Sequence, residues 1–167
     1  GIGPVIEDGF YYDFDFNLSN VSLIKSNESR IIKADLPEIE KRMRELIKKD
    51  LKFKKEILTF AGAKKLFKDQ PYKLELIEEL MSGSRTSKGK GSPTSQELKS
   101  VSIYQSGNFI DLCKGPHIQN TKEINPEAFK LTKIAGAYWH GDEKKPMLTR
   151  IYGIAFETKK ELENYLT

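Results

Sequence analysis

The sequence predicts an α+β protein with a largely antiparallel sheet and helices packed on one face. Two observations lead to this prediction. Strand-like segments occur in pairs joined by short turns, as they do in antiparallel hairpins. The helical segments are grouped and do not alternate regularly with the strands, as they would around a parallel sheet. The 167 residues are 38% hydrophobic and 31% charged, a composition typical of one folded domain with its own core.

The first hairpin is predicted from residues 5–6 and 10–16, with a turn at residues 7–9. The turn contains Asp8-Gly9, and Asp-Gly between apolar runs is a strong hairpin signal. Aromatic residues at even positions share one face of the second strand. They are Phe10, Tyr12, Phe14 and Phe16, and Asp13 and Asp15 lie on the opposite face.

Helices are predicted in the middle of the chain. Asp35 is expected to cap a helix that has Pro37 in its first turn. The apolar stripe of that helix is formed by Ile39, Met43, Leu46 and Ile47. Thr59 is expected to cap a short helix that runs to Phe67, and another helix begins near Pro71. The remaining strands are predicted at 53–58, 101–105, 109–112, 129–139 and 147–156, with loops at 17–29 and 82–95.

Charge and composition exclude several classes of protein. The net charge of +4, with a pI near 9.0, permits contact with a polyanion and does not demonstrate it. No apolar run reaches the ~18 residues of a membrane-spanning helix. Cys113 is the one cysteine, so a secreted disulfide scaffold is excluded and a reducing cytoplasm is expected.

Both ends of the sequence suggest a piece of a longer protein. The chain opens at Gly1 directly on a strand pattern. Residues 1–157 are predicted to form one domain. Residues 158–167 are expected to begin a linker helix toward a catalytic core, because Thr158 and Glu161 form a capping box.

The densest group of reactive side chains lies at residues 111–117. Asp111 and Cys113 alternate at a strand end and therefore face one side, and the Gly115-Pro116 bend turns His117 back toward Cys113. A thiol and an imidazole so placed can share a metal ion or hold one water. Zinc takes three or four ligands, so Cys113 and His117 are an incomplete metal set. The alternative is a cysteine buried for packing beside a surface histidine.

Other motifs in the sequence are weaker indications of function. No phosphate-binding glycine loop and no serine nucleophile elbow occur in the sequence. Basic residues around Tyr138-Trp139 could form a nucleic-acid platform, although a core aromatic under solvated lysines is the favoured interpretation. His140 is expected to be a solvated residue at a hairpin tip.

Four separated stretches, in this order, resemble the editing region of bacterial-type threonyl-tRNA synthetase, the second additional domain that it shares with alanyl-tRNA synthetase. They are residues 2–13, 111–117, 135–139 and 150–153. The resemblance implies hydrolysis of serine misattached to threonine tRNA, within a parent enzyme that attaches threonine using ATP. Such a second site is needed because one methyl group is worth only about 1–3 kcal/mol of discrimination. The alternatives are a non-catalytic module that binds the tRNA acceptor end and a trans-editing deacylase of the alanyl-tRNA type.

The resemblance also implies roles for individual residues. His117 would position or deprotonate the water, Cys113 would occupy the water or metal position, and Asp111 would bind the substrate amine. Lys73 would stabilise the oxyanion or hold a phosphate. Tyr11 and Tyr12 would wall the pocket.

A His-x-x-x-His helix of the family would precede Gly1, so these 167 residues alone are expected to be inactive. No cofactor is expected in them, whereas the parent would use zinc, with ATP and magnesium as substrate. The implied partners are tRNA, the rest of the synthetase chain and a second copy in a homodimer, with no membrane.

Overall fold

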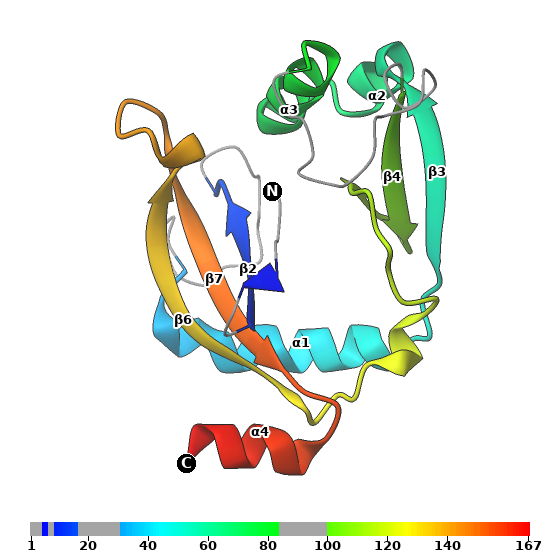
Figure 1. Cartoon of the computed structure of the whole chain (residues 1–167). Coiled ribbons are helices and arrows are strands. Elements are labelled where there is room, and N and C mark those ends of the chain that lie inside the picture. The colour runs from blue at the N-terminus through cyan, green and yellow to red at the C-terminus, as the bar shows by residue number, and fades with distance from the viewer. Residues whose placement is uncertain (1–4, 7–8, 17–30, 84–99) are drawn as a thin grey trace. The chain divides into compact units, whose positions relative to one another are not determined.

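A computed structural model of the chain describes residues 5–6, 9–16, 31–83 and 100–167 (Figure 1). The chain divides into two compact units. Unit 1 comprises Gly1–Asp50 and Thr121–Thr167, and unit 2 comprises Leu51–Asn120. Every strand pairing within the described sheets is antiparallel, which confirms the predicted α+β class.

Unit 1 is built on a four-stranded sheet with the strand order β1-β2-β7-β6. These strands are β1 (Val5–Ile6), β2 (Gly9–Phe14), β6 (Phe129–Tyr138) and β7 (Met147–Ala155). The predicted pairing of β1 with β2 is confirmed, the predicted strands β6 and β7 also pair antiparallel, and β2 lies beside β7, from the far end of the sequence (Figure 1). The turn residues Glu7 and Asp8 and the predicted loop at 17–29 lie outside the described residues.

Helix α1 (Leu36–Lys48) packs against this sheet, after a short 3-10 turn, η1 (Lys33–Asp35). Three buried residues, Leu36, Leu131 and Ile151, centre the core. Phe10, Ile31, Ile39, Met43 and Ile134 pack against them.

Two details of the prediction for helix α1 were wrong. Leu46 is 47% exposed, because it lies about 100° around the helix from the buried Ile47. Asp35 precedes the helix as expected, but its carboxylate accepts from the N–H of Ile32 at 2.8 Å and not from the helix.

Glu40 is a buried charged residue on the same helix face. Its side chain completes the hydrogen bonding of a strand: Oε1 accepts from the N–H of Leu131 at 2.9 Å. The register of β6 against β7 shifts between Leu131 and Lys133 at this point. Arg44 donates to Oε2 of Glu40 at 3.2 Å, so the carboxylate is paired as well as hydrogen-bonded. This satisfies a group that would otherwise be costly to bury.

Unit 2 is built on a three-stranded sheet with the order β3-β4-β5. The strands are β3 (Phe53–Thr59), β4 (Ser100–Ser106) and β5 (Phe109–Leu112). Helices α2 (Phe60–Leu66) and α3 (Pro71–Met81) pack on one face of this sheet. Its buried core consists of Ala63, Phe67, Ile77, Val101 and Ile103. The predicted cap of α2 is confirmed, since Oγ1 of Thr59 accepts from the N–H of Gly62 at 3.1 Å. Most of the predicted loop at 82–95 lies outside the described residues.

The last helix, α4 (Lys159–Leu166), begins with the predicted capping box. Thr158 N–H donates to Glu161 at 2.9 Å, and Glu161 N–H donates back to the Thr158 hydroxyl at 3.3 Å. That this helix leads toward a further domain stays a prediction.

Trp139, in the 3-10 turn η4 (Trp139–Gly141), is only 7% exposed, so it is a core aromatic. None of the helices in the described part of the chain has the length and apolarity to span a bilayer.

Candidate functional site

The candidate site lies on the face of the unit 2 sheet that α2 and α3 leave uncovered. In β4, Val101 and Ile103 point into the helical core, so the alternate residues Ser102 and Tyr104 point to the opposite face. Tyr104 pairs with Asp111 across the β4–β5 hairpin. This places Asp111 and the next alternate residue, Cys113, on that same open face, as the sequence predicts.

Cys113 is tied to the end of the sheet by its backbone. Its N–H donates to the carbonyl of Ser102 at 3.2 Å, and the Ser102 hydroxyl donates to the carbonyl of Cys113 at 2.6 Å. Beyond it, Gly115 turns the chain with a φ of +74°, which favours glycine. The turn returns His117, and the distance from its Nε2 to Sγ of Cys113 is 3.1 Å. The predicted convergence of thiol and imidazole is therefore present.

Two aromatic rings hold the imidazole of His117. Phe53 stacks on it with ring centres 5.7 Å apart and planes 14° apart. Tyr104 meets it edge to face with ring centres 4.2 Å apart. A Cβ on Gly115 would collide with the Tyr104 hydroxyl. Glycine at 115 thus allows Tyr104 to lie under the bend and beside the histidine.

Lys73 and Asp111 form a nearly buried ion pair at the β5 edge. The distance from Lys73 Nζ to Asp111 Oδ1 is 3.1 Å, and the two side chains are only 8% and 13% exposed. The ammonium also donates to the carbonyl of Ile110 at 3.3 Å. Sequence reasoning missed this contact between Lys73 and Asp111, and a role of Lys73 toward the oxyanion or a phosphate stays a prediction.

The Cys113–His117 pair does not by itself fit a zinc site. Sγ and Nε2 are in direct hydrogen-bond contact. Within the described ranges, no third side chain brings a His, Cys, Asp or Glu ligand atom within 4.8 Å of both. Zinc in proteins takes three or four protein ligands. The described donor set is therefore better suited to hydrogen bonding with water or substrate than to holding the metal.

Tyr11 and Tyr12 lie in unit 1 and face opposite sides of β2, because successive strand residues alternate. Tyr12 packs beside Phe14 with ring centres 5.1 Å apart. Tyr11 lies under Arg150, whose guanidinium carbon is 3.9 Å from the ring centre. The two rings thus have different surroundings, and a role for Tyr11 and Tyr12 as pocket walls stays a prediction.

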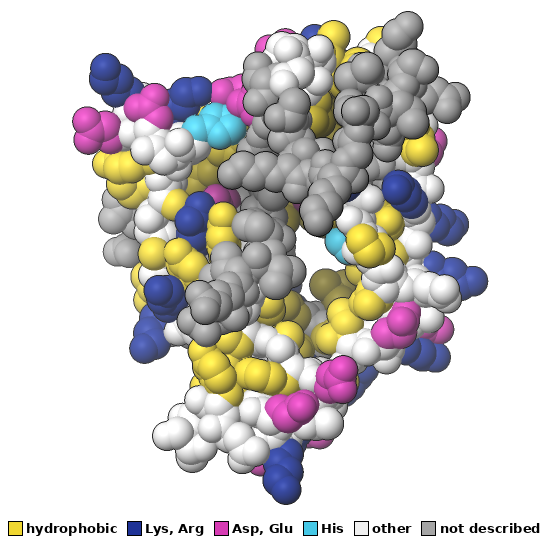
Figure 2. All heavy atoms as spheres, viewed as in Figure 1, with side chains coloured by type: hydrophobic (Ala, Val, Ile, Leu, Met, Phe, Trp, Pro, Cys, Tyr) yellow, Lys and Arg dark blue, Asp and Glu magenta, His cyan; other side chains and the backbone are white. Residues whose placement is uncertain are grey.

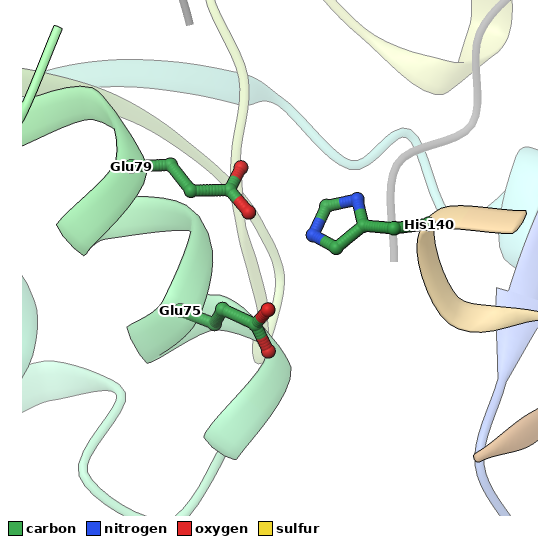
Figure 3. A group of neighbouring side chains, drawn as sticks. All are labelled: Glu75, Glu79 and His140. Carbon is green, nitrogen blue, oxygen red and sulfur yellow. The ribbon is translucent and has the colours of Figure 1, made fainter. Parts of the chain in front are cut away.

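In the face shown in Figure 2, Lys and Arg are interspersed with Asp and Glu. Figure 3 shows Glu75 and Glu79 on successive turns of α3, with both carboxylates on the same side of the helix, and His140 at the turn after β6. His140 is exposed, as expected.

Sequence reasoning did not single out Tyr104 or Phe53. Tyr104 could have been found, because a turn at Gly107-Asn108 pairs Ser106 with Phe109 and therefore sets Tyr104 opposite Asp111. Phe53 could not, because β3 and β4 are separated in the sequence by two helices and the segment 84–99. No short turn fixes their register.

Comparison with known proteins identifies the class of this domain. Residues 101–152, which include Asp111, Cys113 and His117, match the family described as the threonyl and alanyl tRNA synthetase second additional domain. This segment, with its three candidate site residues, is thus similar to the second additional domains of these two synthetases.

Similarity to curated proteins extends over nearly the whole chain. The chain is 47% identical over 166 residues to threonine–tRNA ligase of Borreliella burgdorferi (strain ZS7), and the match covers 99% of this chain and 24% of that protein. It is 50% identical over 165 residues to the ligase of Borrelia turicatae (strain 91E135), with the same two coverages. Identity to the ligase of Thermotoga neapolitana is 46% over 166 residues, 99% of this chain and 22% of that protein. The chain thus spans about a quarter of the length of the threonine–tRNA ligases that it resembles.

Proposed function

We propose that this domain hydrolyses the ester of serine misattached to threonine tRNA. The observation that carries the proposal is the 3.1 Å contact between Cys113 Sγ and His117 Nε2, one alternate strand position from Asp111. All three residues lie in the segment that matches the second additional domain. Similarity to threonine–tRNA ligase supports threonine tRNA as the substrate.

In the proposed reaction His117 is the general base. The attacking water enters between His117 and Cys113, since their present contact is direct, and it then has the imidazole and the thiol as partners. Its proton moves to Nε2 as its oxygen bonds to the ester carbonyl carbon. The tetrahedral adduct collapses, the bond to the ribose oxygen breaks, and that oxygen takes the proton from His117. The products are serine and a tRNA with a free terminal hydroxyl.

Asp111 supplies the contact with the α-ammonium group of the seryl ester. A carboxylate is suited to this because it accepts hydrogen bonds from a cation. Lys73, 3.1 Å from Oδ1, fixes the position of the carboxylate and balances its charge before substrate arrives. Phe53 and Tyr104 hold the imidazole in the orientation that proton transfer needs.

The catalytic set is completed by groups outside these 167 residues. The chain has two histidines, His117 and His140, and hence no His-x-x-x-His pair. We assign the two-histidine half of the site, the joining of threonine to tRNA with ATP, magnesium and zinc, and any dimer contact to the full-length protein.

The test compares the full-length protein with the 167-residue chain. Each is incubated with threonine tRNA that carries serine and with threonine tRNA that carries threonine. The release of free amino acid is then followed. The full-length protein is expected to hydrolyse the seryl ester much faster than the threonyl ester, and the 167-residue chain to hydrolyse neither. Equal hydrolysis of both esters by the full-length protein would contradict an editing role. Binding of tRNA without hydrolysis would indicate the alternative, a module that binds the acceptor end.

A further inference from the structure

Unit 2 contains a cavity of about 240 Å³ at the outer edge of β5. It lies between the end of α2, the start of α3 and the tip of the β4–β5 hairpin. Its lining residues are Leu66, Phe67, Gln70, Lys73, Asn108, Phe109 and Ile110. None of them belongs to the Cys113–His117 pair, but Lys73 lines the cavity and also contacts Asp111. Lys73 is therefore the residue that the cavity shares with the Asp111 end of the candidate site.

The cavity combines an exposed aromatic ring with polar groups. Phe109 is 59% exposed, an unusual degree for a phenylalanine on a short strand. Nζ of Lys73 lies 5.9 Å from the centre of that ring and 5.0 Å from the centre of the Phe67 ring. The side chains of Gln70 and Asn108 add amide groups, each of which can both donate and accept hydrogen bonds.

The size of the cavity limits its occupant. Pockets for drug-sized ligands are about 300–1,000 Å³, so 240 Å³ suits one flat ring better than a whole nucleoside. A phenylalanine side chain would leave the amides of Gln70 and Asn108 unused, and a tyrosine or tryptophan side chain offers them only one polar group. A nucleobase has a π-face for Phe109 and an edge with donors and acceptors for the two amides.

We propose that this cavity holds a nucleobase, that of the nucleotide immediately before the terminal adenosine of the tRNA. The proposal rests on the proposed function, which brings the esterified 3′ end to Cys113 and His117. With the ester there, the chain of the RNA continues past Asp111 and Lys73, and the next base reaches the Phe109 ring. The cavity thereby selects a single-stranded 3′ end of at least two nucleotides.

The test measures binding of short single-stranded RNAs ending in CCA to the 167-residue chain by fluorescence anisotropy. A second RNA lacks only the base of the penultimate nucleotide. Because the abasic RNA cannot stack a base on the Phe109 ring, it is expected to bind about 5- to 150-fold more weakly. Phe109→Ala is expected to weaken the intact RNA by the same factor and to leave the abasic RNA unchanged, whereas Phe109→Tyr keeps the ring and the affinity.

Tyr165→Ala is the matched control, since Tyr165 is a comparably exposed aromatic residue at 51% in unit 1. It is expected to change neither affinity. Equal binding of the intact and abasic RNAs would overturn the proposal while leaving the proposed function intact. Absence of binding to every RNA, with the chain shown to be folded by circular dichroism, would likewise overturn this proposal, whereas the hydrolysis assay of the full-length protein tests the proposed function separately. The abasic comparison uses the unaltered chain, so it does not depend on how a variant folds.

Discussion

Two ion pairs, Asp13–Arg150 in unit 1 and Asp111–Lys73 in unit 2, are built differently. In unit 1, Arg150 donates through Nε and Nη2 to both oxygens of Asp13, at 2.8 and 3.0 Å. In unit 2, the contact of Lys73 with Asp111 runs from a single ammonium to Oδ1. A guanidinium forms a planar fork that fixes the carboxylate in orientation, whereas an ammonium acts as a compact point charge.

The difference indicates a different role for each pair. Asp13 and Arg150 face one another on the adjacent strands β2 and β7, so their ion pair links these two strands. The hydrogen bonds from Arg150 to Asp13 raise the pKa of Arg150 above its already high ordinary value, so the guanidinium keeps its charge. Lys73 and Asp111 instead join a helix to the strand that leads into Cys113. We expect the first pair to affect stability alone and the second to affect stability and activity.

The largest expected effect belongs to His117, next to the second pair. His117→Ala removes the proposed general base, and the rate of seryl-tRNA hydrolysis by the full-length protein should fall about 10²–10⁴-fold. Single-turnover release of serine measures it. A rate within threefold of the unaltered protein would show that the imidazole does not transfer the proton.

Lys73→Met should lower the free energy of unfolding by about 3–5 kcal/mol, because it leaves the nearly buried Asp111 carboxylate without its cation. Urea titration of the 167-residue chain measures this loss. The double variant with Asp111→Asn should recover part of it, since no unpaired charge remains. A single variant that costs less than 1 kcal/mol would mean that water reaches the carboxylate freely.

Asp13→Asn should cost about 1–3 kcal/mol, less than the change at Lys73, because the Arg150 side chain is 25% exposed and water can replace part of the lost pairing. The same titration measures it. Seryl-tRNA hydrolysis should fall far less than with Asp111→Asn at equal temperature. If both variants reduce hydrolysis equally, the two pairs do not differ in the way proposed.

The smallest effect is expected at Tyr104. Loss of the aromatic contact with His117 in Tyr104→Leu should slow hydrolysis about two- to tenfold, in line with the usual strength of ring pairs. Tyr104→Phe retains the ring and should stay within about twofold. The pH profile of the rate separates positioning from general destabilisation, because only a displaced imidazole moves its midpoint. An unchanged profile in Tyr104→Leu would assign Tyr104 to packing alone.

Local patterns predicted the fold well where one signal fixes a neighbour a few residues away. The Gly115-Pro116 bend predicted the meeting of Cys113 and His117, and the capping box predicted the start of α4. Prediction failed where a contact joins distant segments. Lys73 meets Asp111 across 38 residues of sequence, and neither residue type reveals its partner. The burial of Glu40 was missed for the same reason, because its acceptor role depends on Leu131, 91 residues further along the chain.

The hydrogen bond that the Leu131 N–H donates to Glu40 joins α1 to β6, in addition to their shared apolar core. The N–H of Leu131 has a helix side chain as its acceptor, at the shift in register beside β7. Its exchange with deuterium should therefore report the release of α1 and not the fraying of the sheet. The exchange rate of this one amide can therefore measure how often α1 separates from the sheet.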